Sequence, residues 1–159
     1  MNNKSKIHDE DTLARMIRWC AYRERSQFET AQKLQTFTLS PSDKKNIMHY
    51  LSERGYVDEL RFARAFVRGK FRQNQWGRLK IQAALRSQHI ASDIVKKALG
   101  TIDEAEYERI IHKLAVAKAK TLNEDANTYE NKAKIYRYLS AKGFTPDEIR
   151  KATELLFSK

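Results

Sequence analysis

Hydrophobic residues recur along most of this chain at spacings of three and four, the period of an α-helix that buries one face. The pattern is clearest over residues 58–72, where apolar and basic side chains fall on opposite arcs of a helix. The apolar arc consists of Phe62, Ala63, Phe66, Val67 and Phe71, and the basic arc consists of Arg61, Arg64, Arg68 and Arg72. We therefore expect an all-α protein in which this helix packs one arc into a core and exposes the other.

Capping residues divide the hydrophobic pattern into short helices. Ser26–Glu29 and Thr145–Glu148 have the spacing of capping boxes, and Ser40–Pro41 suits the start of another helix. Glycines that suit helix ends are Gly55, Gly100 and Gly143. These signals predict helices joined by tight connections and grouped in threes.

The groups of three repeat along the chain. Equivalent apolar positions recur at a constant shift of 51 residues and then of 54 residues. They are Phe28, Leu34 and Leu39, then Leu79, Leu85 and Ile90, then Ala133, Leu139 and Phe144. The middle copy has Ala91 where the others have a capping residue, and we expect Ser92 to cap that helix instead.

This repeat predicts three tandem three-helix units in an elongated, curved array whose neighbours share their apolar faces. We expect a disordered N-terminal tail at residues 1–11. The first repeat is expected at residues 12–55, the second, which holds the basic centre, at residues 56–101, and the third at residues 102–159.

Composition agrees with a soluble helical protein and argues against a membrane protein. Of the 159 residues, 41% are hydrophobic and 32% charged, and the apolar runs are far shorter than the roughly 20 residues that span a bilayer. No apolar segment follows the charged N-terminus as in a secretory signal. The single cysteine, Cys20, lies on an apolar helix face, so we expect a core thiol in a cytoplasmic protein.

Positive charge is concentrated in the middle of the chain. The formal net charge is +11, and from Arg61 to Lys97 ten basic residues face only one acidic residue, Asp93. Such a distribution is typical of a surface that meets nucleic acid or an acidic protein groove. The alternative is a solvated helix face, but such faces usually mix charges of both signs.

Eight residues of this basic centre form the candidate partner surface. Guanidinium groups suit it because they pair bidentately with carboxylate or phosphate. The candidates are Arg61, Arg64, Arg68, Lys70, Arg72, Trp76, Arg78 and Lys80. Two interpretations of the tryptophan stay open: it stacks on a base or fills a partner's pocket, or it holds a loop to the core.

Catalytic chemistry has little support in this sequence. The four histidines are isolated, and neither a zinc-binding motif nor a glycine-rich phosphate loop is present. A metal-dependent nuclease needs carboxylates that converge on the basic centre, where Asp93 stands alone. We therefore expect a protein that is not an enzyme and that binds no metal or cofactor.

Two stretches of the middle repeat resemble the RecX family, the regulators of the bacterial recombinase RecA. They are GYVDELRFARAFV from Gly55 and WGRLKI from Trp76, and YLSAKGF from Tyr138 is similar to the family's C-terminal repeat. The resemblance runs from about Leu13 to the end, although the first repeat departs more, with TLSP after Phe37. It implies a curved helical protein that binds in the groove of RecA filaments on single-stranded DNA and inhibits strand exchange, ATP hydrolysis and coprotease activity.

The main alternative is a stand-alone DNA-binding module of the helix-turn-helix type. Residues 77–88 would place Arg78, Gln82 and Arg86 in one row, as a recognition helix does. Direct DNA binding weakens steeply with salt, whereas a RecA regulator acts only when RecA is present. The residues alone leave open whether the basic face meets RecA carboxylates or DNA phosphates on single or double strands. They give no evidence for an oligomer, so we expect a monomer.

Overall fold

The computed structural model describes residues 9–122 and 127–157, and within them it contains nine α-helices and no strand. The helices are α1 Glu10–Tyr22, α2 Gln27–Leu34, α3 Pro41–Glu53, α4 Glu59–Arg72, α5 Arg78–Ser87, α6 Ser92–Leu99, α7 Glu104–Lys120, α8 Tyr129–Lys142 and α9 Pro146–Phe157. The expected all-α class is confirmed. Most of the tail predicted at residues 1–11 lies outside the described residues, and α1 begins at Glu10.

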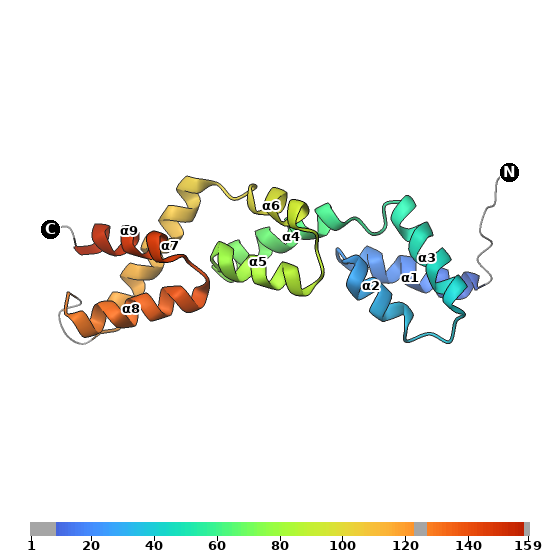
Figure 1. Cartoon of the computed structure of the whole chain (residues 1–159), viewed down its shortest axis with the longest axis horizontal. Coiled ribbons are helices and arrows are strands. Elements are labelled where there is room, and N and C mark those ends of the chain that lie inside the picture. Colours follow the sequence, from blue (N-terminus) through green and yellow to red (C-terminus); the bar gives the residue numbers. More distant parts are fainter. Residues whose placement is uncertain (1–8, 123–126, 158–159) are drawn as a thin grey trace.

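The helices form three triplets, α1–α3, α4–α6 and α7–α9, that lie in a row along the long axis of the molecule (Figure 1). The middle helices of the triplets begin after Ser26, Gly77 and Thr128, which are 51 residues apart in both steps. These helices have 8, 10 and 14 residues. The shift of 54 residues between the equivalent apolar positions of α5 and α8 therefore reflects about one extra turn at the start of α8.

Most capping predictions are confirmed. Ser26 and Glu29 form a reciprocal capping box at the start of α2, and Thr145 and Glu148 exchange the same pair of bonds before α9. The prediction that Ser92 caps α6 is wrong. Ala91 is the N-cap and no side chain caps this helix, whose exposed first turn leaves its N–H groups to water.

The hydrophobic core has two parts, which corrects the expectation that all neighbouring units share apolar faces. The first triplet has a small core of its own, which contains the buried Cys20 as predicted. The second and third triplets share one continuous core, in which Phe71, Tyr107 and Phe144 stack in sequence with ring centroids 5.7 and 5.5 Å apart. The last two triplets are therefore joined by apolar packing.

The first and second triplets meet instead through a polar junction. Ser26 Oγ donates to Gln88 Oε1 at 3.0 Å, and the backbone N–H of Gln27 donates to Glu59 Oε1 at 2.6 Å. The Phe28 and His89 rings lie 4.3 Å apart beside these bonds. These polar contacts and the ring contact lie outside the two hydrophobic cores, so the first junction lacks the continuous apolar packing of the second.

Glu59 supplies a test of the polar junction. Burial raises the pKa of this carboxyl above its usual value of 4.5, so the ionised group lowers the stability of the folded state at neutral pH. Glutamine removes the charge, and its amide oxygen can still accept the Gln27 N–H. We expect Glu59→Gln to retain more stability at pH 7 than the exposed control Glu10→Gln, because both residues begin a helix and lose the same dipole interaction.

The free energy of unfolding, measured by urea titration at neutral and acidic pH, checks this prediction. The folded pKa of Glu59 is the higher one, so the penalty is present above that pKa and disappears below the unfolded pKa of about 4.5. The difference between the two variants should therefore shrink as the pH falls below 4.5. A Glu59→Gln protein less stable than Glu10→Gln at neutral pH would show that the ionised carboxylate stabilises the junction.

Candidate partner-binding surface

Helix α4 orients the central arginines. Asp58 accepts the Arg61 N–H at 2.9 Å and so caps the helix, and buried apolar side chains fix its rotation. Those buried side chains are Phe62, Ala63, Val67 and Phe71, as the sequence pattern predicts. The opposite arc, which consists of Arg61, Arg64, Arg68 and Arg72, is exposed.

Carboxylates from neighbouring segments reach both ends of this arc, which corrects the expectation that it is not neutralised. Arg61 Nε lies 2.8 Å from a Glu24 carboxylate oxygen, and Arg61 Nη2 donates to the Gly55 carbonyl at 2.7 Å. At the other end, Arg72 Nε lies 3.9 Å from Glu106. Arg61 therefore helps to join the first two triplets, and Arg72 is weakly held by the third.

Arg64 and Arg68, at the centre of the arc, remain available. Both are exposed, and neither forms an ion pair with any carboxylate in residues 9–122 and 127–157. They border hollows on both sides of α4. One hollow is also lined by Thr101, Ile102, Asp103 and Glu106, and the other by Glu24, Asp58, Leu60 and Ala65. Two adjacent guanidinium groups without partners can bind a carboxylate or a phosphate bidentately.

Lys70, Trp76 and Lys80 form a second cluster on another side of α4. At about 100° per residue, Lys70 lies roughly 180° around the helix from Arg61. The ammonium groups of Lys70 and Lys80 lie 4.8 and 4.5 Å from the Trp76 ring centroid, respectively. Trp76 is half-buried against the shared core. The structure thus separates these residues from the arginines that the sequence analysis grouped with them.

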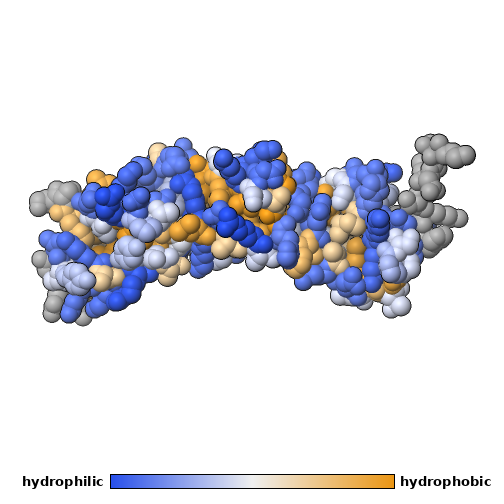
Figure 2. Space-filling model, viewed as in Figure 1, coloured by the Kyte–Doolittle hydropathy of each residue, from blue (hydrophilic) through white to orange (hydrophobic). Residues whose placement is uncertain are grey.

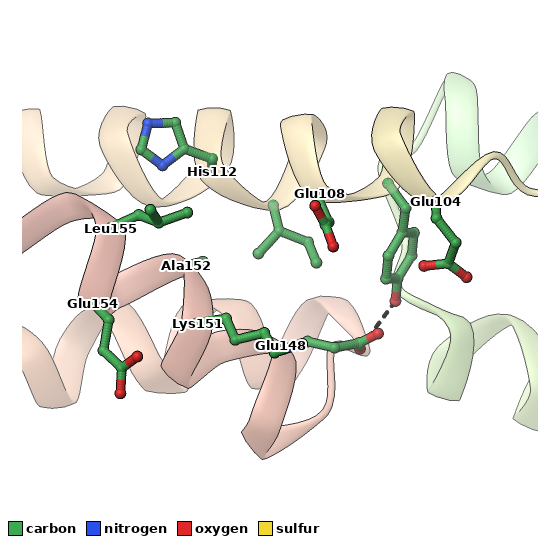
Figure 3. A pocket seen from close by; sticks show the side chains of 10 residues that line it. Glu104, Glu108, His112, Glu148, Lys151, Ala152, Glu154 and Leu155 are labelled. Carbon is green, nitrogen blue, oxygen red and sulfur yellow. Dashed lines mark hydrogen bonds between the residues drawn. The ribbon is translucent and has the colours of Figure 1, made fainter.

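Arg78 lies between the second and third triplets, and its side chain is only 25% exposed. Its guanidinium carbon lies 3.9 Å from the Tyr107 ring centroid and its nitrogens pair with Glu104 and, at 3.4 Å, with Glu148. Burial raises the pKa of Tyr107 far above its usual value, so the phenol stays protonated and donates to Glu148 at 3.1 Å (Figure 3). This ion-pair cluster joins two triplets and occupies Arg78.

The row of Arg78, Gln82 and Arg86 expected of a DNA recognition helix is therefore incomplete. Arg86 is exposed and Gln82 is half-buried, but the contacts of Arg78 hold it against the third triplet. A recognition helix needs its polar side chains together on one free face. The geometry of α5 does not favour the helix-turn-helix interpretation.

Backbone groups also join α5 to α8, a feature that the sequence analysis missed. The N–H groups of Gly77 and Leu79 donate to the carbonyls of Lys142 and Gly143 at 2.7 and 3.0 Å. The last carbonyls of α8 thereby satisfy the free donors at the start of α5. The signal in the sequence is Gly77 itself, because an N-cap glycine has no side-chain oxygen and another group must accept these bonds.

Neither a metal site nor a membrane span is visible in the described part of the chain. Within residues 9–122 and 127–157, no three His, Cys, Asp or Glu side chains lie close enough together to hold a metal ion. None of the described helices combines the length and the apolar character that crossing a bilayer requires.

Comparisons with known proteins agree on one family. Models described as the second and third three-helix domains of RecX match residues 58–99 and 104–153. Regulatory protein RecX of Pelodictyon phaeoclathratiforme is 31% identical over 134 residues, which cover 84% of this chain and 81% of the relative. The protein of the same name from Chromohalobacter salexigens is 30% identical over 137 residues, 86% of each chain.

The fold is similar to that of a solved structure. The crystal structure of RecX from Lactobacillus salivarius superimposes with a TM-score of 0.84 and covers 94% of this chain and 97% of its own, at 20% identity. This similarity supports the arrangement of three-helix repeats in a row.

Proposed function

This chain belongs to the RecX family, and from this premise we propose that it regulates the bacterial recombinase RecA by binding the groove of RecA filaments on single-stranded DNA. Inhibition of ATP hydrolysis, strand exchange and coprotease activity is the expected result. The protein acts in the cytoplasm, in recombination and DNA repair, as a monomer that binds its target, without catalysis and without a cofactor.

The observation that carries this proposal is the pair Arg64 and Arg68. Both side chains are exposed at the centre of α4 and have no carboxylate partner in the described part of the chain, whereas carboxylates hold Arg61 and Arg72 on either side. Arginines kept this close without neutralisation repel each other and cost some stability. An anionic partner, either RecA carboxylates or DNA phosphates, would relieve that repulsion, and the flanking pairs hold the arc in place for it.

The shape of the molecule supports binding along a filament. The three triplets lie end to end, and the middle one carries the arginines (Figure 1). Hydrophilic side chains cover most of the visible face, with smaller hydrophobic patches between them (Figure 2). An extended, mainly polar surface suits many weak contacts along a groove, and a single exposed ion pair contributes only about 0–1 kcal/mol.

Lys70, Trp76, Arg78 and Lys80 have different parts in this proposal. Lys70 and Lys80 lie over the face of Trp76 and form a secondary contact area of the same triplet. Arg78 acts indirectly, because its ion pairs fix the orientation of the third triplet against the second. We therefore assign the main contact to Arg64 and Arg68.

Dependence on RecA tests the proposal against simple DNA binding. The protein, labelled at its N-terminal amine, is titrated with bare single-stranded DNA and with filaments of RecA on the same DNA, and anisotropy gives both dissociation constants. We expect the filament to bind at least about tenfold more tightly, a difference of roughly 1.4 kcal/mol. Equal affinity, or tighter binding to bare DNA, would favour the stand-alone DNA-binding module.

A further inference from the structure

We propose that the groove between α8 and α9 binds single-stranded nucleic acid by stacking bases on Tyr129 and Tyr136. The proposal deepens the proposed function, because it adds a DNA contact in the third triplet to the arginine pair in the second. It rests on the proposed function in one respect only, namely that the bound strand is the single-stranded DNA of the RecA filament. The binding itself is a property of this groove and is tested without RecA.

The two tyrosines are exposed in a way that packing does not explain. Tyr129 is 88% exposed and Tyr136 is 43% exposed, and neither is among the buried residues of the hydrophobic core. By contrast, Tyr138 on the same helix is half-buried against that core, and Tyr107 is buried and hydrogen-bonded. Aromatic side chains that are exposed on a helix surface are available to a ligand.

Helix α8 presents both rings toward one groove. Tyr129 and Tyr136 are seven residues apart, which is two turns and roughly 10 Å along the same face. The groove that they line continues onto α9. Lys132 and Arg137 of α8 and Arg150 and Phe157 of α9 also line it. Two exposed rings along one groove can stack two bases of a flexible single strand.

Cations surround the rings at positions suited to phosphates. Lys132 and Arg137 are exposed, and neither has a carboxylate within ion-pair distance in residues 9–122 and 127–157. The Lys132 ammonium lies 5.1 Å from the Phe157 ring centroid, which holds it at the groove. Arg150, from α9, is only loosely held by Asp147 at 3.4 Å.

Aromatic rings with cations beside them favour a polyanion with flat bases. Stacking on an aromatic side chain tolerates any base, and the cations neutralise the backbone beside it. The lining of the groove is mainly apolar, and three aromatic rings, Tyr129, Tyr136 and Phe157, contribute to it beside Ala133, Pro146 and Ile149. These rings supply the flat surface on which bases stack. The two carboxylates in the lining, Asp147 and Glu154, are fewer than the three cations.

Anisotropy of a fluorescein-labelled oligothymidylate tests this groove. The variants are Tyr129→Ala/Tyr136→Ala, Lys132→Ala/Arg137→Ala and the control Tyr22→Ala, which removes a tyrosine that is 86% exposed in the first triplet. Circular dichroism verifies that each variant is folded. Every titration is repeated at several salt concentrations and with an abasic strand of the same length.

We expect the tyrosine double variant to bind oligothymidylate at least about tenfold more weakly, with an unchanged salt dependence, because stacking is lost and no charge is removed. The Lys132 and Arg137 variant should lower the slope of log K against log salt by about 1.4, or about 0.7 per phosphate contact. The control should bind as the wild type does. On the abasic strand, the wild type should fall to the level of the tyrosine variant.

Three results would overturn the proposal. One is equal binding of oligothymidylate by the wild type and the tyrosine variant. Another is that the tyrosine substitutions weaken binding to the abasic strand by the same factor as binding to oligothymidylate. The third is a tyrosine variant that keeps oligonucleotide binding but loses its effect on RecA, which would make the groove a protein-docking surface. Because the oligonucleotide titration contains no RecA, its failure is separate from failure of the proposed function, which depends on Arg64 and Arg68.

Discussion

Gly143→Ala is expected to lower the free energy of unfolding by about 2–5 kcal/mol, because it disturbs the joint between α5 and α8. Gly143 has a φ of +100°, which L residues rarely adopt. An added Cβ would lie 2.7 Å from the backbone nitrogen of Lys80 and closer still to the Lys80 Cβ. Neither atom is the free end of a side chain, so the helices must move apart and the bonds from Gly77 and Leu79 must weaken.

Urea denaturation followed by circular dichroism measures this effect, and Gly69→Ala is its control. Gly69 lies inside α4, and an added Cβ there meets no atom within 4 Å. Alanine is the better helix former by roughly 0.5–1 kcal/mol, so the control should be as stable as the wild type or more stable. A Gly143→Ala protein within about 0.5 kcal/mol of the wild type, the range of an ordinary surface substitution, would show that this contact does not hold the two triplets together.

Arg64→Glu/Arg68→Glu is expected to weaken binding to the RecA filament at least about tenfold while leaving the fold intact. Both side chains are exposed and carry no ion pair in the described part of the chain, so their replacement breaks no ion pair there. The reversal turns two proposed attractions into repulsions. Within α4 it exchanges one like-charge pair for another but places opposite charges one turn from Arg61 and Arg72, so stability should stay about the same.

The matched control for this variant is Arg109→Glu/Lys113→Glu. These residues are also exposed and four apart, but they lie on α7 in the third triplet. The change in net charge is the same, so a general loss of attraction to DNA would affect both variants equally. Equal weakening by the two variants in filament anisotropy would contradict the assignment of the contact to α4.

Local signals in the sequence predict much of this fold. The capping boxes at Ser26 and Thr145 and the glycine at 143 mark helix ends because each acts within a few residues. The apolar arc of α4 is equally local, since the helical period alone assigns its sides. The same period places Lys70 on another side of α4 from the arginines, so this separation can also be read from the sequence.

The candidate site is harder to predict because its partners are distant along the chain. Glu24 lies 37 residues before Arg61, and Glu148 lies 70 residues after Arg78. Basic residues without acidic neighbours in the sequence therefore look unpaired, although other triplets supply carboxylates to Arg61, Arg72 and Arg78. Only the structure distinguishes Arg64 and Arg68 from their neutralised neighbours.

The proposed role is tested by single-strand-dependent ATP hydrolysis of the host's RecA on preformed filaments. The wild type, Arg64→Glu/Arg68→Glu and Arg109→Glu/Lys113→Glu are each added, first well below and then at the RecA concentration. We predict inhibition by the wild type and by the α7 control, and its loss in the folded α4 variant. Unchanged hydrolysis with the wild type, or full inhibition by the α4 variant, would contradict regulation of RecA through these two arginines.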